Sequence, residues 1–356
     1  MLSLSQNFGL SWYIAKIKFA IKMGSLGDST IPVVDLSPLA GKYEDLNDAV
    51  FGQLVEKVGQ AFNEVGFVYI VNHGVDMDKI EHIHKLSKGF FTMSAATKNK
   101  YKKPNAAINW HGYSGPGDEF LNEAEKNSTE LREMFDAWGF EQFDEKHFPT
   151  EVPGYKDAFD AVRPECNNVG KKLLRLLGKY LHLDDDELFV KAHSFMNNPT
   201  KIRTHSQFRT LHYYPMEPND PSIPPNAIRC GEHADWGTIT LLFQDMVGGL
   251  EVKRLDGSWI EATPIEGSIL VNIAQLMELW SAGIFRATPH RVRILDVERI
   301  RKTARQSFIY FINPDGDYVV KPVVKCPPGD EEYLERTPIV AYDHYLRLMA
   351  DATLRY

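Results

Sequence analysis

Apolar residues recur along this chain with two different periods. In the first half they return every three or four positions, which is the spacing of a helix with one buried face. We predict helices over residues 46–62, 80–90 and 159–180. Pro164 lies inside the last of these helices and could kink it. Two β-branched runs, Ile31–Leu36 and Phe67–Val71, predict short strands on either side of the first helix.

From about residue 203 the helical period gives way to short apolar stretches. We predict strands over 211–214, 238–243, 250–252, 268–273, 292–295 and 307–312. Turn signals such as Gly248-Gly249 and Asp256-Gly257 separate them, and the tail from Glu331 to Tyr356 reads as helix again. Short strands at this spacing favour a closed antiparallel sheet over a parallel array. The prediction is an α+β fold, with a jelly-roll core (a double-stranded β-helix) flanked by N-terminal helices and a C-terminal helix.

The same pattern divides the chain into four regions. They are an N-terminal extension over 1–29, a mostly helical region over 30–196, the jelly-roll core over 197–320 and a helical closure over 321–356. The extension carries Lys16, Lys18 and Lys22 among apolar residues. We favour an extended start over a targeting segment, because the lysines interrupt the apolar run that a signal peptide needs.

The composition limits the classes of binding partner and the cellular location that we expect. Of the 356 residues 43% are hydrophobic and 25% are charged, which is ordinary for a folded globular protein, and the net charge is −8. An acidic chain is a poor match for a protein that works by neutralising phosphates, so we expect no nucleic acid partner. No stretch of eighteen apolar residues is present, so we expect no membrane span. Three cysteines suit a reducing compartment, and we expect a cytoplasmic protein.

Candidate metal ligands begin with His233 and Asp235, which stand two positions apart before a strand-like run. On a strand such residues face the same side, so both can reach one ion. The spacing alone means little, because His182 and Asp184 share it at a helix end where an exposed position explains them. His290, 57 residues after His233, is the candidate third ligand. Two imidazoles and one carboxylate form the facial triad of non-haem Fe(II) oxygenases, although Zn²⁺ accepts similar ligands.

Arg305 and Ser307 supply a second candidate site at the start of the last predicted strand. A guanidinium binds a carboxylate through two parallel hydrogen bonds, and a hydroxyl on the same side of the strand adds a third. The alternative is a surface arginine that makes an ordinary salt bridge.

Several segments in order resemble the iron(II)- and 2-oxoglutarate-dependent dioxygenases of the isopenicillin N synthase-like superfamily. They are Ile31–Leu36, Gly66–Val75, Gly112–Glu119, Arg132–Asp136, Gly231–Gly249 and Thr288–Val292. The resemblance implies that His233, Asp235 and His290 bind Fe(II). It also implies that Arg305 and Ser307 hold the distal carboxylate of 2-oxoglutarate, and that Tyr214 contacts the same co-substrate.

The chain departs from the family pattern at two places. His212 stands where many plant members carry Asn, and Ala274-Gln275 stands where Gly-Asp is common. We expect the second change to alter a helix cap without abolishing iron binding. His73 is interpreted as a structural histidine near a strand end.

The pocket walls are expected from three places. They are residues 109–113, the surroundings of Arg203 and Phe208, and the C-terminal helix.

The predicted function is oxidation, above all hydroxylation, of a small organic molecule, with 2-oxoglutarate and O2 consumed and succinate and CO2 released. No catalytic residue beyond the metal ligands is predicted, and the oligomeric state is left open. Two alternatives remain at this point: an isopenicillin N synthase-type Fe(II) oxidase that needs no 2-oxoglutarate, and a non-catalytic binding protein on the same barrel.

Overall fold

The computed structural model describes most of the chain from residue 30 onward. The described residues are 30–41, 47–103, 111–119, 129–138, 147–196, 204–215, 221, 227–293, 303–326 and 332–353. The predicted extension 1–29 lies outside them, as do Arg203 and the first two residues of the predicted wall 109–113. From Pro32 to Tyr356 the chain forms one compact unit, which is the unit considered below.

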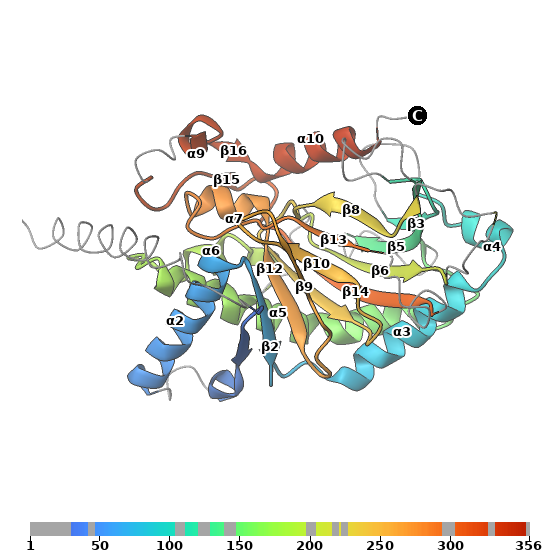
Figure 1. The fold of residues 1–356 in the computed structure, drawn as a ribbon, viewed down its shortest axis with the longest axis horizontal. Helices are drawn as coiled ribbons and strands as arrows, with labels where there is room; N and C mark the ends of the chain where they lie inside the picture. The colour runs from blue at the N-terminus through green and yellow to red at the C-terminus, as the bar shows by residue number, and fades with distance from the viewer. Residues whose placement is uncertain are drawn as a thin grey trace, which may run out of the picture. The chain divides into compact units, whose positions relative to one another are not determined.

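A large sheet of eight strands runs through this unit (Figure 1). In spatial order its strands are β1 (Val33–Asp35), β2 (Phe67–Val71), β12 (Ile269–Ile273), β9 (Ile239–Gln244), β14 (Arg305–Ile312), β6 (Gln207–Tyr213), β5 (Arg132–Trp138) and β3 (Gly112–Ser114). Apart from the parallel pair β1 and β2, neighbours in this sheet run antiparallel. Strands distant in the chain therefore lie side by side, as a jelly roll requires.

A small antiparallel sheet forms the opposite wall of the jelly roll. Its strands, in spatial order, are β11 (Trp259–Glu261), β10 (Leu250–Lys253), β13 (His290–Val292) and β8 (Cys230–His233). Two minor pairs complete the β-structure: β4 (Thr129–Glu130) with β7 (Ala227–Ile228), and β15 (Val319–Val320) with β16 (Ile339–Val340).

Three long helices cover the other face of the large sheet. They are α2 (Asp48–Glu64), α3 (Met77–Phe91) and α5 (Tyr155–Tyr180). The shorter helical elements are η2 (Ser37–Leu39), α4 (Ala95–Asn99), α6 (Leu188–Lys191), η6 (Ser194–Met196), α7 (Gln275–Trp280), α9 (Glu332–Glu335) and α10 (Ala341–Thr353). None of the helices in the described part of the chain combines the length and apolar composition needed to span a bilayer.

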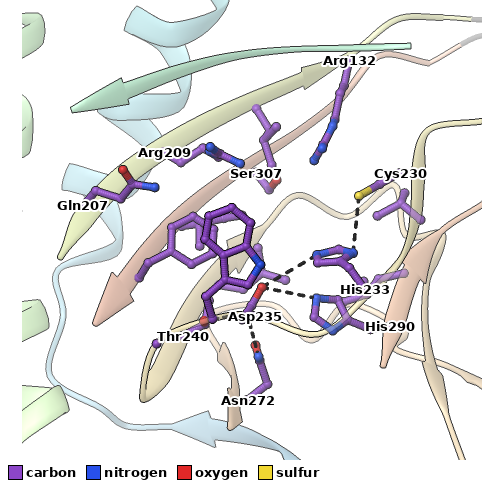
Figure 2. Close-up of a pocket in the computed structure, with 18 of the residues that line it drawn as sticks. Arg132, Gln207, Arg209, Cys230, His233, Asp235, Thr240, Asn272, His290 and Ser307 are labelled. Carbon is purple, nitrogen blue, oxygen red and sulfur yellow. Dashed lines mark hydrogen bonds and ion pairs between the residues drawn. The ribbon is translucent and has the colours of Figure 1, made fainter. Parts of the chain in front are cut away.

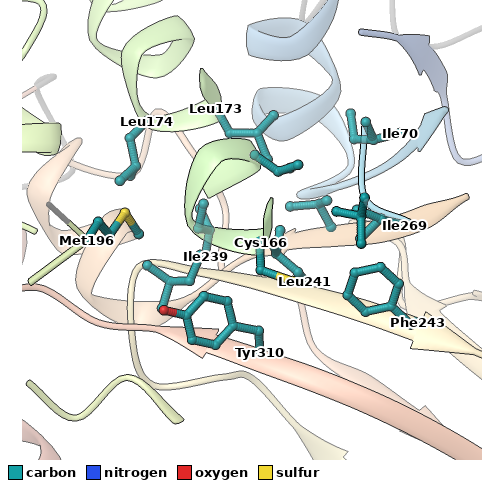
Figure 3. Packing of buried hydrophobic residues seen from close by; sticks show 14 of the residues in the cluster. Ile70, Cys166, Leu173, Leu174, Met196, Ile239, Leu241, Phe243, Ile269 and Tyr310 are labelled. Carbon is teal, nitrogen blue, oxygen red and sulfur yellow. The ribbon is translucent and has the colours of Figure 1, made fainter. Parts of the chain in front are cut away.

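The main hydrophobic core lies between the large sheet and α5 (Figure 3). On β9 the side chains of Ile239, Leu241 and Phe243 belong to this core, whereas Thr240 and Leu242 line the cavity on the other side. Because side chains alternate across a strand, one face of each central strand builds the core and the other builds the cavity. Both faces of these strands are buried, so they read as continuous apolar runs.

The helices and most strands of the sequence prediction are confirmed within a few residues. Strand β2 matches the predicted Phe67–Val71, and α5 runs continuously through Pro164. Strands β3, β5 and β8 were not predicted, and the tail contains a short strand, β16, between its two helices. The predicted division between residues 196 and 197 stays a prediction. Strands from both sides of this point belong to the same large sheet.

Candidate metal and 2-oxoglutarate site

The predicted metal ligands converge between the two sheets (Figure 2). His233 ends β8 and His290 begins β13, and the two residues are direct partners across this antiparallel pair. The Nε2 atoms of His233 and His290 lie 3.7 Å and 3.9 Å from Asp235 Oδ1. The candidate ligand atoms all lie within 4.8 Å of one another, close enough for one ion to bind all three.

Asp235 reaches the site by a route that differs from the prediction. It follows the end of β8 and lies in the connection to β9, so the two ligands do not share one strand face. Gln275 fixes this connection: its backbone N–H donates to Asp235 O at 2.8 Å, and its side chain donates to Ala234 O at 3.2 Å. Helix α7 has Ala274 at its N-cap without a side-chain cap. The expected alteration of the helix cap is therefore present, and Gln275 supports the connection that carries Asp235.

Neighbouring groups orient each ligand for metal binding. The Nδ1 atoms of His233 and His290 lie 2.9 Å and 3.3 Å from the carbonyl oxygens of Gly231 and Thr288. These carbonyls favour the tautomer with hydrogen on Nδ1, which leaves both Nε2 lone pairs facing Asp235. Burial, and next the neighbouring His233, lower the pKa of His290 to about 4, so its imidazole stays neutral.

The two carboxylate oxygens of Asp235 have different contacts. Its Oδ2 accepts hydrogen bonds from Thr240 Oγ1 at 2.6 Å and from Asn272 Nδ2 at 2.7 Å, which leaves Oδ1 for a metal. Burial alone would raise the pKa of Asp235, but the two imidazoles and these two donors outweigh it and hold that pKa below its usual value. Sequence reasoning missed Thr240 and Asn272, because both lie inside apolar strand runs.

Arg305 and Ser307 face the cavity from the start of β14, and each side chain is 1% exposed. Among the described residues, Nε and Nη1 of Arg305 and Oγ of Ser307 have no hydrogen-bond partner. The Nη2 atom of Arg305 lies 3.5 Å from Gln244 Oε1. A buried guanidinium without a carboxylate is unfavourable, so these donor atoms are available to a ligand that supplies one.

The tyrosine beside this arginine is Tyr213, and the prediction of Tyr214 is corrected here. Tyr213 lines the cavity, and the Cζ atom of Arg305 lies 4.9 Å from its ring centre. Tyr214 does not line the cavity; burial, and next the carboxylate of Glu133, raise the pKa of its hydroxyl. The alternation of β6 explains the difference, because neighbouring residues point to opposite faces of the sheet. His212 likewise faces away and stacks on Phe91.

Two family models match the chain. The model described as the N-terminal region of non-haem dioxygenases in morphine synthesis matches residues 31–158, and the model of the 2OG-Fe(II) oxygenase superfamily matches residues 205–314. A 2-oxoglutarate-dependent dioxygenase, frbA, of Dothideomycetidae sp. is 30% identical over 287 residues, which cover 75% of this chain and 82% of the relative. The chain belongs to the 2OG-Fe(II) oxygenase superfamily.

Other relatives agree with this assignment. Feruloyl CoA ortho-hydroxylase F6H1-3 of Ipomoea batatas is 29% identical over 321 residues, covering 90% of this chain and 80% of the relative. Among solved structures, a full-length Neurospora crassa protein in complex with alpha-KG shares the fold with a TM-score of 0.74 and 25% identity. The match covers 90% of this chain and 96% of the Neurospora protein. This protein is therefore an Fe(II)- and 2-oxoglutarate-dependent dioxygenase that also uses O2, on a jelly-roll core.

The structure also shows where three other predicted positions of this dioxygenase lie. His73 is structural: its Nδ1 accepts from Val75 N at 3.0 Å, and its Nε2 lies 3.1 Å from Gly267 O. Tyr345 of α10 lines the cavity, which confirms the expected wall from the C-terminal helix. Phe208 was expected in the wall but belongs to the hydrophobic core, and its neighbours Gln207 and Arg209 line the cavity instead. The expected wall from residues 109–113 is also wrong for its described part, because residues 111–113 do not line the cavity and Tyr113 belongs to the core.

Proposed function

We propose that His233, Asp235 and His290 hold the catalytic Fe(II) through the two Nε2 atoms and Oδ1. The support is the donor set itself: two imidazoles and one carboxylate whose candidate ligand atoms lie within 4.8 Å of one another. These three residues would hold the ion and would leave other coordination positions for the co-substrates. Their single negative charge leaves the ferrous ion with a net positive charge, which favours the anionic keto-acid end of 2-oxoglutarate.

We propose further that Arg305 and Ser307 bind the distal carboxylate of 2-oxoglutarate, with Tyr213 in the place predicted for Tyr214. The observation that carries this assignment is the set of buried, unpartnered donor atoms on Arg305 and Ser307 within the described structure. A carboxylate offers acceptor sites for two parallel guanidinium bonds and one hydroxyl bond.

The protein's own groups then prepare the reaction. The bound iron supplies the redox chemistry, in which 2-oxoglutarate and O2 become succinate and CO2 while one oxygen atom enters a C–H bond of a small-molecule substrate. The carbonyls of Gly231 and Thr288 hold the imidazoles in position, and Thr240 and Asn272 fix the carboxylate. Apolar side chains such as Leu242 and Val292 line the cavity and exclude water from it.

The test measures Fe(II) binding and O2-dependent succinate formation by the purified enzyme. Asp235→Ala and His290→Ala are expected to lose both, because each removes one of three ligands. The matched control is His182→Asn, which alters the other His-x-Asp sequence at an exposed position outside the cavity. Retention of iron and of succinate formation by both ligand variants would refute the assignment.

We also propose a cytoplasmic location, supported by three cysteines that are all free. Fluorescence imaging of the full-length chain carrying a C-terminal fluorescent tag tests it. An organellar or secreted signal would contradict the proposal and assign a targeting role to the N-terminal extension.

A further inference from the structure

One neutral polar side chain in the cavity has an acceptor atom without a partner. Gln207 lines the cavity and is 4% exposed, and its carboxamide oxygen Oε1 has no hydrogen-bond partner among the described residues. Figure 2 shows Gln207 across the cavity from His233 and His290. A buried acceptor that stays unpaired is unfavourable, so Oε1 is available to a donor that a ligand supplies.

Strand pairing places Gln207 at the level of the proposed metal ligands. Phe311 of β14 is the direct partner of Gln207 on β6 and of Thr240 on β9, and Thr240 donates to Asp235. The main chains of Gln207 and Thr240 are therefore two strand spacings apart, which is about 10 Å and the length of a small organic molecule. A substrate with its reacting carbon at the metal can reach Gln207 with its far end.

The proposed co-substrate site extends away from Gln207. Ser307 and Arg305 stand four and six residues before Phe311 on β14. These separations correspond to about 14 Å and 20 Å along an antiparallel strand. A molecule of 2-oxoglutarate that reaches from the metal to Arg305 and Ser307 therefore leaves Gln207 free for the substrate.

Two aromatic side chains form a corner beside this acceptor. Trp236, which directly follows Asp235, and Tyr345 of α10 both line the cavity, and their ring centres lie 5.4 Å apart at an angle of 75°. Burial, and next the carboxylate of Asp136, raise the pKa of the Tyr345 hydroxyl, and the adjacent Gln207 opposes them. Tyr345 therefore lies next to Gln207. Aromatic rings pack favourably edge-to-face or offset, so this corner suits a flat ring.

The charged side chains nearest to Gln207 are paired within the protein. Arg209 binds Asp136 through two hydrogen bonds of 2.6 Å and 2.8 Å, and its Nη1 lies 3.2 Å from Glu119 Oε2. An ionic group of a ligand would lose its water here and would meet charges that already have partners. The recognition that remains is a hydrogen bond from a neutral donor, together with contact to the aromatic corner.

We propose that Gln207, Trp236 and Tyr345 form the substrate-recognition site, and that this site takes a flat, uncharged ring that carries an N–H or O–H donor. The donor binds Gln207 Oε1, and the ring packs in the corner between Trp236 and Tyr345. The proposal rests on the proposed function, since it takes the metal site as the place of reaction. It assigns the three side chains to substrate binding and orientation and not to the metal.

Three flat probes of similar size test the selection. Indole carries an N–H donor, benzofuran has a ring oxygen in its place, and 1-methylquinolinium is a cation without a donor. Each is titrated into the anaerobic complex of the full-length enzyme with Fe(II) and 2-oxoglutarate, and its Kd is obtained from the rise of the thermal unfolding midpoint with probe concentration. We expect indole to bind about 3–10-fold more tightly than benzofuran, the effect of one neutral hydrogen bond, and 1-methylquinolinium to bind more weakly than indole.

Two pairs of variants connect the result to the site. Gln207→Met removes the acceptor at similar length and is expected to bring the ratio of the indole and benzofuran Kd values close to one. Its control is Thr210→Val on the same strand, whose hydroxyl contacts Tyr155 on the opposite face and whose loss leaves the ratio unchanged. Tyr345→Leu is expected to weaken both probes by about 3–10-fold, because the ring contact is lost, whereas Tyr345→Phe keeps the ring and the affinity.

Equal affinity of the wild-type enzyme for indole and benzofuran overturns the proposal, as does tighter binding of 1-methylquinolinium or the absence of indole binding. A preference for indole that persists in Gln207→Met, or an equal loss in Tyr345→Leu and Tyr345→Phe, also overturns it. Calorimetric titration of 2-oxoglutarate into each Fe(II)-loaded protein keeps the two proposals apart. If 2-oxoglutarate binds normally, a failed probe test rejects only the recognition site; if the wild-type enzyme does not bind 2-oxoglutarate, the proposed function itself fails.

Discussion

Replacing Arg305 by Met tests the co-substrate site most directly, because the change has two opposite consequences. It removes the two parallel charge-assisted hydrogen bonds that we propose Arg305 makes to the distal carboxylate. Such bonds contribute about 1.5–3 kcal/mol each, so loss of the pair costs at least ~3 kcal/mol. This corresponds to a Kd for 2-oxoglutarate that is weaker on the order of 100-fold.

The same substitution is expected to stabilise the protein that holds no co-substrate. The guanidinium of Arg305 is 1% exposed, and two of its nitrogens have no hydrogen-bond partner in the described residues. Methionine has a similar length and no charge to desolvate, and buried charges replaced by apolar side chains often raise stability. We therefore expect an unfolding midpoint for Arg305→Met that is equal to or higher than that of the wild-type protein.

Calorimetry with the Fe(II)-loaded enzyme under anaerobic conditions measures the first effect, and thermal unfolding without 2-oxoglutarate measures the second. A chemical control is 2-oxopentanoate, which has a methyl group where 2-oxoglutarate has its distal carboxylate. The wild-type enzyme should prefer 2-oxoglutarate strongly, and Arg305→Met should lose this preference. Equal affinity of wild type and variant for 2-oxoglutarate would show that the carboxylate binds elsewhere.

Three further predictions address the support of the metal site and the stability of the fold. Asn272→Ala leaves Asp235 Oδ2 with a single hydrogen-bond donor, Thr240. We expect Fe(II) affinity to fall by about 10–100-fold in a metal titration. An unchanged affinity would show that Asn272 does not support the site. Gly66→Ala places a Cβ 2.2 Å from Thr288 Oγ1 at a φ of +77°, so it should lower the free energy of unfolding by about 2–4 kcal/mol. Gly74→Ala, with a φ of +83° and open space, should cost only ~1–2 kcal/mol in the same denaturant experiment, and equal costs would exclude the steric contact. Burial lowers the pKa of His193 to about 4 from 6.5, so the unfolded chain binds the proton first and stability should fall as the pH drops from 6.5 toward 4; urea unfolding of His193→Asn should show a weaker dependence in that range.

The sequence alone was enough to predict the helical layer and most of the jelly roll. Helices α2, α3 and α5 each bury one face, so their period of three to four residues is visible without any structure. Strand β5 was missed because its inward side chains, Arg132, Met134 and Asp136, mix charge with an apolar residue. Charged residues are rarely buried without partners, and those partners come from distant parts of the chain.

The site residues show the same difference between what the local sequence indicates and what strand pairing decides. His233, Asp235 and His290 could be predicted as metal ligands because metal chemistry demands particular residue types, and those types are visible in any sequence. Tyr213 and Tyr214 could not be told apart by type, since adjacent tyrosines differ only in which face of β6 they occupy. That choice is made by the pairing of β6 with β14, where Tyr213 meets Arg305.

Residue chemistry, periodicity and the family resemblance thus predicted the class of this protein, its candidate metal ligands and its candidate co-substrate pair. Tertiary structure decided what surrounds them: the support of Asp235 by Thr240 and Asn272, and the pairing of the buried Arg209 with Asp136 and Glu119. The physical reason is how far apart along the chain the interacting residues lie. Helical and strand periods and ligand types are local properties of the chain, whereas a buried charge is balanced by residues that only folding brings within a few ångströms of it.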